Sequence, residues 1–172
     1  MKEITKAILQ VMEAVKNVEK QMTVGTGQSS YKAVSDSLVR NTIRPEMVKA
    51  GLVVIPVSID PKATTERWTE NSQYGEKTRQ QIFTEAICKY KLIHSESGES
   101  LEISGYGHGV DSQDKSAGKA TTYALKNALL DTFLITKGES EDTDAVHSDD
   151  MPVPKTKLEN KSKKQEVFEE PF

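Results

Sequence analysis

A long helical pattern between residues 114 and 135 constrains this chain more than any other feature of its sequence. At 100° per residue, four alanines gather within about 80° on one side of this helix, at positions 117, 120, 124 and 128. Side chains this small let a helix approach a sheet closely, because nothing bulky holds the two backbones apart. The stripe therefore predicts a helix that lies against a β-sheet.

The other side of the same helix carries cations and larger side chains. Three lysines fall within about 40° of one another: Lys115, Lys119 and Lys126. Tyr123 lies beside them, and Leu130 and Phe133 follow on the same side. We expect the lysines to face solvent, either as an ordinary helix surface or as contacts for successive phosphates. Because a solvated face rarely carries Leu and Phe, we expect a neighbouring subunit to cover Leu130 and Phe133.

An alternating pattern over residues 82–94 predicts a strand with one buried face. Cys88 and Tyr90 share the apolar parity, whereas Lys89 and Lys91 point to the opposite face. A buried cysteine in this position is a packing residue rather than a nucleophile. We expect Lys89 and Lys91 to extend the basic surface of the helix.

A turn signal at 96–99 is followed by a return strand, which predicts a β-hairpin. Tyr106 and His108 lie on the polar face of the return strand. Exposed rings of this kind stack on unpaired bases, so we interpret both as candidate contacts for single-stranded nucleic acid. The alternative interpretation is that both are partly exposed strand aromatics without a ligand.

The remaining segments complete the fold. The patterns predict helices over 4–20 and 35–51, the second interrupted by Pro45, then a short edge strand at 52–57. Residues 60–80 are polar and predict a long, turn-rich excursion between strands. The order helix, helix, strand, strand, strand, helix predicts an α+β fold with helices packed against an antiparallel sheet and a long C-terminal helix.

Composition changes beyond Gly138, where charged residues and proline replace apolar ones. This predicts a folded domain over 1–138 and a disordered acidic tail over 139–172. The whole chain carries a net charge of −3, but residues 137–172 hold six lysines and ten acids, so residues 1–136 carry +1. The net charge of the whole chain is therefore no argument against a nucleic-acid partner.

Several classes of protein are excluded by residues that the sequence lacks. No apolar run approaches the roughly 18–20 residues of a membrane span, and the start of the chain has no secretory pattern. One cysteine allows no disulfide within the chain, and three scattered histidines disfavour a structural zinc site. We expect a soluble, cytoplasmic protein without a metal or another cofactor.

No catalytic arrangement emerges from the motifs. The glycines at 105–109 have the wrong spacing for a dinucleotide loop, and Gly118 and Lys119 lack the rest of a P-loop. Asp111 and Asp114 could bind magnesium, as in a nuclease, but we favour a role in capping the following helix. We expect a protein that is not an enzyme. Weaker candidates for nucleic-acid contacts are Lys32, Arg40 and Arg44.

Two groups of motifs together resemble the ERF (essential recombination function) single-strand annealing proteins of bacteriophages. The first group comprises YKAVSD at 31–36, RP at 44–45 and GLVVIP at 51–56. The second comprises GYGHGVD at 105–111, DKSAGKA at 114–120 and YALKNALL at 123–130. The second group is also similar to the annealing domain of eukaryotic recombination mediators. The resemblance covers roughly residues 5–138.

This resemblance implies ATP-independent binding and annealing of complementary DNA strands in homologous recombination, on a ring or helical assembly of identical subunits. It places the protein in the cytoplasm of an infected or lysogenic host cell. The DNA groove that it implies uses Lys115, Lys119 and Lys126 with Lys89 and Lys91. The alternatives are a single-stranded-DNA protector that does not anneal, and a structural helix–sheet module that binds no DNA.

The end of the tail carries a separate signal. Its residues resemble the acidic tips of bacterial single-stranded-DNA-binding proteins: Phe168, Glu169, Glu170, Pro171 and Phe172. Such segments place an aromatic ring in an apolar pocket and acids on basic residues. We expect this segment to bind host single-stranded-DNA-binding or repair proteins, or the DNA groove of the protein itself. A chance acidic terminus is the alternative.

Overall fold

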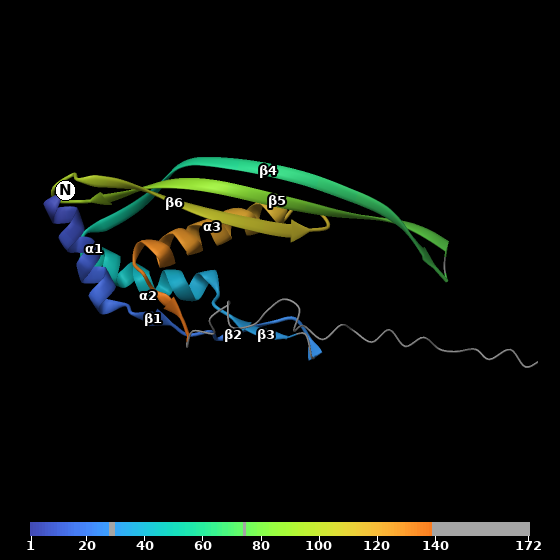
Figure 1. Cartoon of the computed structure of the whole chain (residues 1–172), viewed down its shortest axis with the longest axis horizontal. Coiled ribbons are helices and arrows are strands. Elements are labelled where there is room, and N and C mark those ends of the chain that lie inside the picture. The colour runs from blue at the N-terminus through green and yellow to red at the C-terminus, as the bar shows by residue number, and fades with distance from the viewer. Residues whose placement is uncertain (28–29, 74, 139–172) are drawn as a thin grey trace, which may run out of the picture. The chain divides into compact units, whose positions relative to one another are not determined.

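A computed structural model describes residues 1–27, 30–73 and 75–138 of the chain (Figure 1). The chain divides into two units, Met1–Ser140 and Glu141–Phe172. The predicted disordered tail over 139–172 lies outside the described residues. The first unit has the predicted α+β fold, with a three-stranded antiparallel sheet and three helices among the described residues.

The sheet consists of β4 (Leu52–Ser72), β5 (Gly75–His94) and β6 (Ser100–Asp111), in the order β4-β5-β6. Both pairs of strands are antiparallel. The register of β4 shifts between Pro56 and Ser58, as expected of a proline in an edge strand. The outer strands β4 and β6 each leave one edge of this sheet unpaired.

The predicted alternation on β5 is confirmed and defines the two faces of the sheet. Cys88 and Tyr90 are buried, and we call the face that bears them the inner face. Lys89 and Lys91 are exposed on the opposite side, which we call the outer face.

β4 and β5 continue beyond the end of β6 as a two-stranded arm, which we define as residues 66–72 and 75–81 (Figure 1). Their pairing extends to Ser72 opposite Gly75, whereas β6 pairs with β5 only as far as Ile82. The prediction of a turn-rich excursion over 60–80 is therefore wrong. Polar side chains occupy both faces of the arm, so no apolar parity marks the strands in the sequence.

α3 (Ser116–Thr132) packs along the inner face of the sheet, on β5 and β6. A Cβ atom built on Gly105, Gly107 or Gly109 of β6 would lie 2.0, 2.1 or 2.3 Å from a carbonyl oxygen of α3. Three of the four predicted alanines are fully buried: Ala120, Ala124 and Ala128. The predicted contact between an alanine stripe and a sheet is thus confirmed, and the glycines of β6 complete it.

A second hydrophobic core lies against the C-terminal half of α3. α1 (Lys2–Ala14) and α2 (Asp36–Lys49) supply buried side chains to this core, and Leu130 and Phe133 belong to it, each 1% exposed. The expectation that a neighbouring subunit covers Leu130 and Phe133 is therefore wrong. Residues of the same chain already bury them.

Some element boundaries differ from the predicted ones. α1 ends at Ala14 rather than near residue 20, and the chain then forms β1 (Asn17–Val18), which pairs in parallel with β7 (Thr136–Lys137). α2 continues through Pro45, where we expected an interruption. Two further strands pair with each other: β2 (Met22–Val24) and β3 (Tyr31–Ala33).

Glu99, which precedes β6, holds the N-terminus of α1. Its carboxylate accepts hydrogen bonds of 2.9 Å from the backbone N–H groups of Glu3 and Ile4, and it contacts the amino group of Met1. These donors favour the charged carboxylate and lower the pKa of Glu99 to about 2. The sheet and α1 are thereby joined at a helix N-terminus, where a negative charge is stabilising.

We predict that Glu99→Gln lowers the melting temperature at neutral pH. Because the pKa of Glu99 is lower in the folded chain than in the unfolded chain, its contribution to stability is present above pH 5 and disappears as the pH falls toward 2. Thermal unfolding at several pH values measures this difference. The control is Glu96→Gln on the same turn, and a loss for Glu99→Gln that persists at pH 2 would contradict the prediction.

We also predict that Gly107→Ala destabilises the fold by about 2–3 kcal/mol, since its methyl group would overlap the carbonyl oxygen of Ala120. Gly118→Ala is the matched control, because no atom lies within 4 Å of the added methyl group there. The control should stabilise α3 by about 0.5–1 kcal/mol. Chemical denaturation measures both changes, and equal effects at the two sites would refute the close contact.

Candidate nucleic-acid interface

Four aromatic side chains, three of them arranged around His108, lie at the free edge of β6, and we call them the aromatic row. The ring of His108 stacks on Phe83 with a centroid distance of 6.1 Å and on Tyr123 of α3 at 6.4 Å. Tyr106 lies 6.1 Å from the same imidazole. Phe83, Tyr106 and Tyr123 are 37%, 49% and 41% exposed, so the row offers ring surface to a ligand.

Local sequence explains how three elements contribute to one row. Glycines at alternate positions of β6 face α3, which leaves Tyr106 and His108 on the outer face. Because the glycines let α3 lie close to β6, Tyr123 reaches around the strand edge to His108. Phe83 joins from β5 on the outer face. The predicted pair Tyr106 and His108 is thus brought together with Tyr123, whereas sequence reasoning missed Phe83.

The hydroxyl of Tyr106 is fixed by an acid of the neighbouring strand. It donates a hydrogen bond of 3.4 Å to Oε1 of Glu85. Partial desolvation and the negative charge of Glu85 raise the pKa of Tyr106, which moves it further above physiological pH. A neutral, oriented phenol ring is a suitable surface for base stacking.

Two polar side chains of α3 hold the edge of β6 from the other side. Nζ of Lys119 donates to the carbonyl oxygen of Val110 and to Oδ2 of Asp111, both at 2.7 Å. Nδ2 of Asn127 donates to the carbonyl oxygen of Tyr106 at 3.0 Å. These bonds satisfy carbonyl groups on an edge strand, and the side chain of Lys119 remains 48% exposed.

Lys126 is buried, in contrast to the exposed position that we expected. Its Nζ donates to the carbonyl oxygen of Val34 at 3.1 Å and lies 4.1 Å from the centroid of the Tyr123 ring. Burial, together with the positive charge of Lys137, lowers the pKa of Lys126. Lys126 therefore contacts the ring of Tyr123 through its ammonium group and does not belong to an exposed row of lysines.

The exposed lysines divide into two groups on opposite sides of the sheet. Lys119 of α3 and Lys115, which precedes that helix, lie on the inner side, whereas Lys89 and Lys91 lie on the outer face. Nζ of Lys89 is 3.3 Å from a carboxylate oxygen of Glu102. The expected continuous track of lysines is thus absent from the described part of one chain, and the aromatic row lies between the two groups.

The weaker candidates lie apart from the aromatic row. Lys32 of β3 donates to Thr23 at 2.8 Å, and Arg40 of α2 pairs with Asp36 at 2.8 Å. Arg40 and Arg44 border an apolar groove of about 260 Å³ that shares no residue with the row. The structure therefore does not bring these three cations together with the predicted stacking residues.

Neither of the two acids near the start of α3 is its N-cap residue. That residue is Lys115, whose side chain makes no capping hydrogen bond. Asp111 instead accepts hydrogen bonds from Lys119 and from the backbone N–H of Gln113, and these two donors lower its pKa. Within residues 1–27, 30–73 and 75–138, no three His, Cys, Asp or Glu side chains gather as a metal site.

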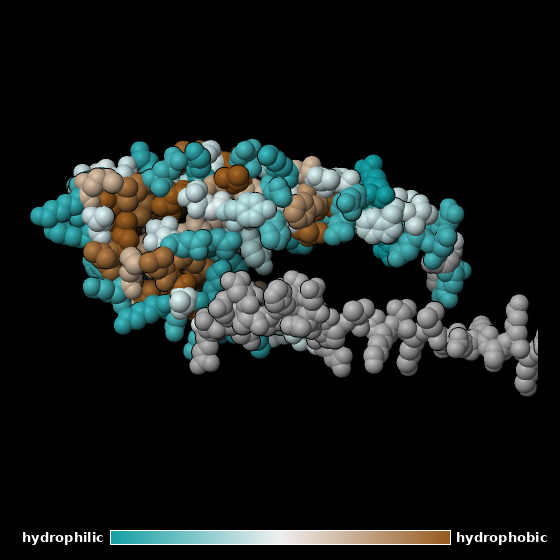
Figure 2. Space-filling view, viewed as in Figure 1, coloured by the Kyte–Doolittle hydropathy of each residue, from teal (hydrophilic) through white to brown (hydrophobic). Residues whose placement is uncertain are grey.

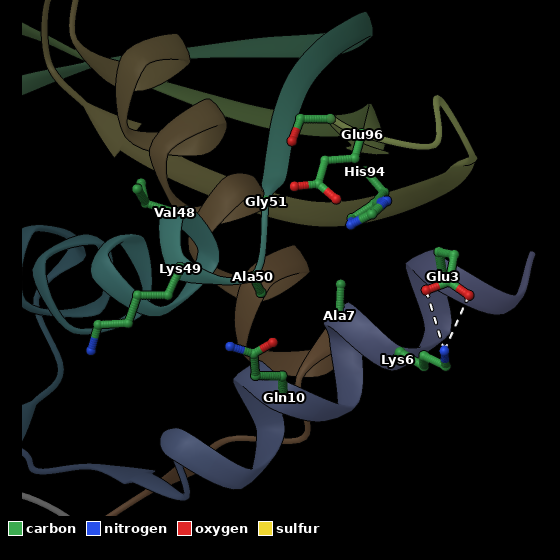
Figure 3. A pocket seen from close by; sticks show the side chains of 11 residues that line it. Glu3, Lys6, Ala7, Gln10, Val48, Lys49, Ala50, Gly51, His94 and Glu96 are labelled. Atoms are coloured by element: carbon green, nitrogen blue, oxygen red, sulfur yellow. Dashed lines mark hydrogen bonds and ion pairs between the residues drawn. The ribbon is translucent and has the colours of Figure 1, made fainter.

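A polar cleft of about 440 Å³ lies between α1, the C-terminal end of α2 and the turn after β5 (Figure 3). Glu3, Lys6, Lys49, His94 and Glu96 give it charges of both signs, and Lys6 and Glu3 form an ion pair. None of the predicted nucleic-acid contacts lines this cleft.

A comparison with protein families gives independent evidence on the function of this surface. The sequence model of the ERF superfamily matches residues 4–170, nearly the whole chain. The chain belongs to the ERF superfamily. This membership connects it in general terms with nucleic-acid binding, single-strand annealing and recombination. The family match extends 32 residues past residue 138, where we expected the resemblance to end, and thus includes most of the tail.

The search of curated proteins gives no match. Among the described residues, no helix combines the length and the apolar character needed to span a membrane.

Because Lys126 is buried in this ERF chain, we predict that its replacement changes the free energy of unfolding. Lys126→Ala should lower the free energy of unfolding by about 1–3 kcal/mol, because it removes the donor to Val34 and leaves a buried carbonyl group unsatisfied. Lys115→Ala, at an exposed lysine of the same helix, should change it by less than about 0.5 kcal/mol. Chemical denaturation compares the two variants, and equal stabilities would contradict the buried position.

Proposed function

We propose that this chain binds single-stranded DNA without sequence preference and anneals complementary strands without ATP during homologous recombination. The aromatic row is the observation that carries the proposal, because exposed rings stack on unpaired bases of any sequence. Membership of the ERF superfamily supports the same function. The two groups of exposed lysines flank the row and supply phosphate contacts that are independent of sequence.

Stacking suits an annealing protein because it uses the flat face of a base. The hydrogen-bonding edge of that base stays free to meet a complementary strand. Base pairing then supplies the free energy of the reaction, so no nucleotide hydrolysis and no cofactor are required. On this basis we propose a DNA-binding protein that is not an enzyme.

A single chain offers four rings, which contact only a few bases. We propose that several copies assemble into a ring or a helix, so that one strand crosses the rows of successive subunits. Many weak contacts along one strand then add up to tight binding.

We predict that Tyr106→Ala weakens binding to single-stranded DNA roughly 5- to 150-fold, the effect of losing one stacked base. The control is Tyr31→Ala, which removes an exposed tyrosine outside the aromatic row. Fluorescence anisotropy with a labelled oligonucleotide measures affinity, and mixing of complementary oligonucleotides without nucleotide measures annealing. Binding without annealing would favour the protector function instead.

The same assay tests the lysines. Lys91→Ala and Lys119→Ala should weaken binding to all sequences alike, and each lost phosphate contact should reduce the salt slope by about 0.7. A loss confined to certain sequences would contradict backbone contacts.

The acidic segment at 168–172 lies outside the described residues. We propose that it binds host single-stranded-DNA-binding or repair proteins, because aromatic residues flanked by acids bind apolar pockets with basic rims. Deletion of residues 168–172 should abolish such binding and leave the folded domain intact. Unchanged binding to these proteins and unchanged DNA affinity in the deletion variant would refute a role for this segment.

A further inference from the structure

The outer face of the sheet continues onto the arm, where it carries the single tryptophan of the chain, Trp68. Trp68 is 44% exposed and lies opposite Arg79 of β5. Nε of Arg79 is held by Oε2 of Glu70 at 2.7 Å. In Figure 2, strongly hydrophobic side chains gather around α1 and α2, whereas hydrophilic and pale ones cover the far end of the arm. Trp68 is therefore a large ring in polar surroundings.

Two adjoining hollows connect Trp68 with the aromatic row. The first, of about 350 Å³, is lined by Trp68 and Arg79 and reaches Gln81 and Val110. The second, of about 300 Å³, shares Gln81 and Val110 with the first and is bordered by Phe83. Phe83 in turn stacks on His108. A line of ring surfaces thus runs from the arm along the outer face to the edge of β6.

We propose that an unpaired nucleic-acid strand continues from the aromatic row along the outer face of the arm, where one of its bases stacks on Trp68. This inference rests on the proposed function and names a second part of its binding site. Nothing in the motifs at 31–56 or 105–130 indicates this part, because the arm lies between them.

The chemistry of the arm favours a nucleic acid over a second copy of the chain. A stable protein interface needs a contiguous apolar core, but the outer face of the arm places Trp68 among threonine, glutamine and charged residues. Two cations on this face lie near Trp68 and could meet phosphates: Lys77, and Arg79, which is paired with Glu70. The two hollows offer the rings of Trp68 and Phe83 and the amide of Gln81, and the carboxylates of Glu66, Glu70 and Asp111 also line them.

The arm pairs with no third strand among the described residues. A two-stranded ribbon is marginally stable in water, and residues 66–72 and 75–81 pair only with each other. A strand of nucleic acid stacked on the outer face would add contacts to both β4 and β5. Binding is therefore expected to stabilise the arm.

The test uses the intrinsic fluorescence of Trp68 in the full chain. Addition of unlabelled oligodeoxythymidylate should change the Trp68 emission, with the same midpoint as the anisotropy of a labelled copy. Trp68→Ala should weaken binding roughly 5- to 150-fold, whereas Trp68→Phe should retain most of the affinity. The control is Thr69→Ala, which lies next to Trp68 on the opposite face of the arm. Circular dichroism checks that each variant is folded.

The outcomes separate this inference from the proposed function. If the oligonucleotide binds and anneals, but the Trp68 emission and the affinity of Trp68→Ala stay unchanged, the inference is wrong and the proposed function stands. If the emission instead changes with protein concentration and does not respond to the oligonucleotide, Trp68 contacts a second copy, and the inference is again wrong. If no oligonucleotide binds at all, both fail together.

Discussion

The contact between α3 and β6 leaves no room for a side chain on the strand, and the rest of the structure depends on this closeness. Glycine at 105, 107 and 109 removes the atoms that would overlap the carbonyl groups of α3. The short distance then lets Lys119 and Asn127 reach carbonyl groups at the free edge of β6. It also places Tyr123 beside His108, so that a packing constraint creates the aromatic row.

The same contact determines where charge can lie. Since α3 covers the inner face, Lys89, Lys91 and the aromatic rings of the strands lie on the outer face of the sheet. Lys126 is buried between the ring of Tyr123 and the carbonyl group of Val34. A ligand that contacts lysines of both groups has to pass the edge of β6, where the rings are exposed. The edge of one strand is thus the point at which stacking and phosphate contacts meet.

The elements that could be predicted from the sequence are those whose buried residues recur at a regular spacing. Alternation on β5 and the alanine stripe on α3 were interpreted correctly, because each element has one buried face. The arm was missed together with Trp68, since a ribbon exposed on both faces has no apolar parity. Phe83 lies in the predicted strand, on its outer face, and only the fold brings it to His108. The burial of Lys126 could not be predicted either, because it depends on Val34, which is 92 residues away in the chain.

Charge alone gives this domain little affinity for a polyanion, so the DNA binding that we propose depends on the aromatic surface. Residues 1–136 carry a net charge of +1, and two of the four exposed lysines at the interface, Lys89 and Lys119, already pair with acids. The release of counterions from phosphates is therefore modest for each subunit. Stacking on neutral rings does not require a net positive charge, and it holds each base by the face that pairing does not use. A nearly neutral surface of this kind can keep one strand bound while a second strand, with the same negative charge, approaches it.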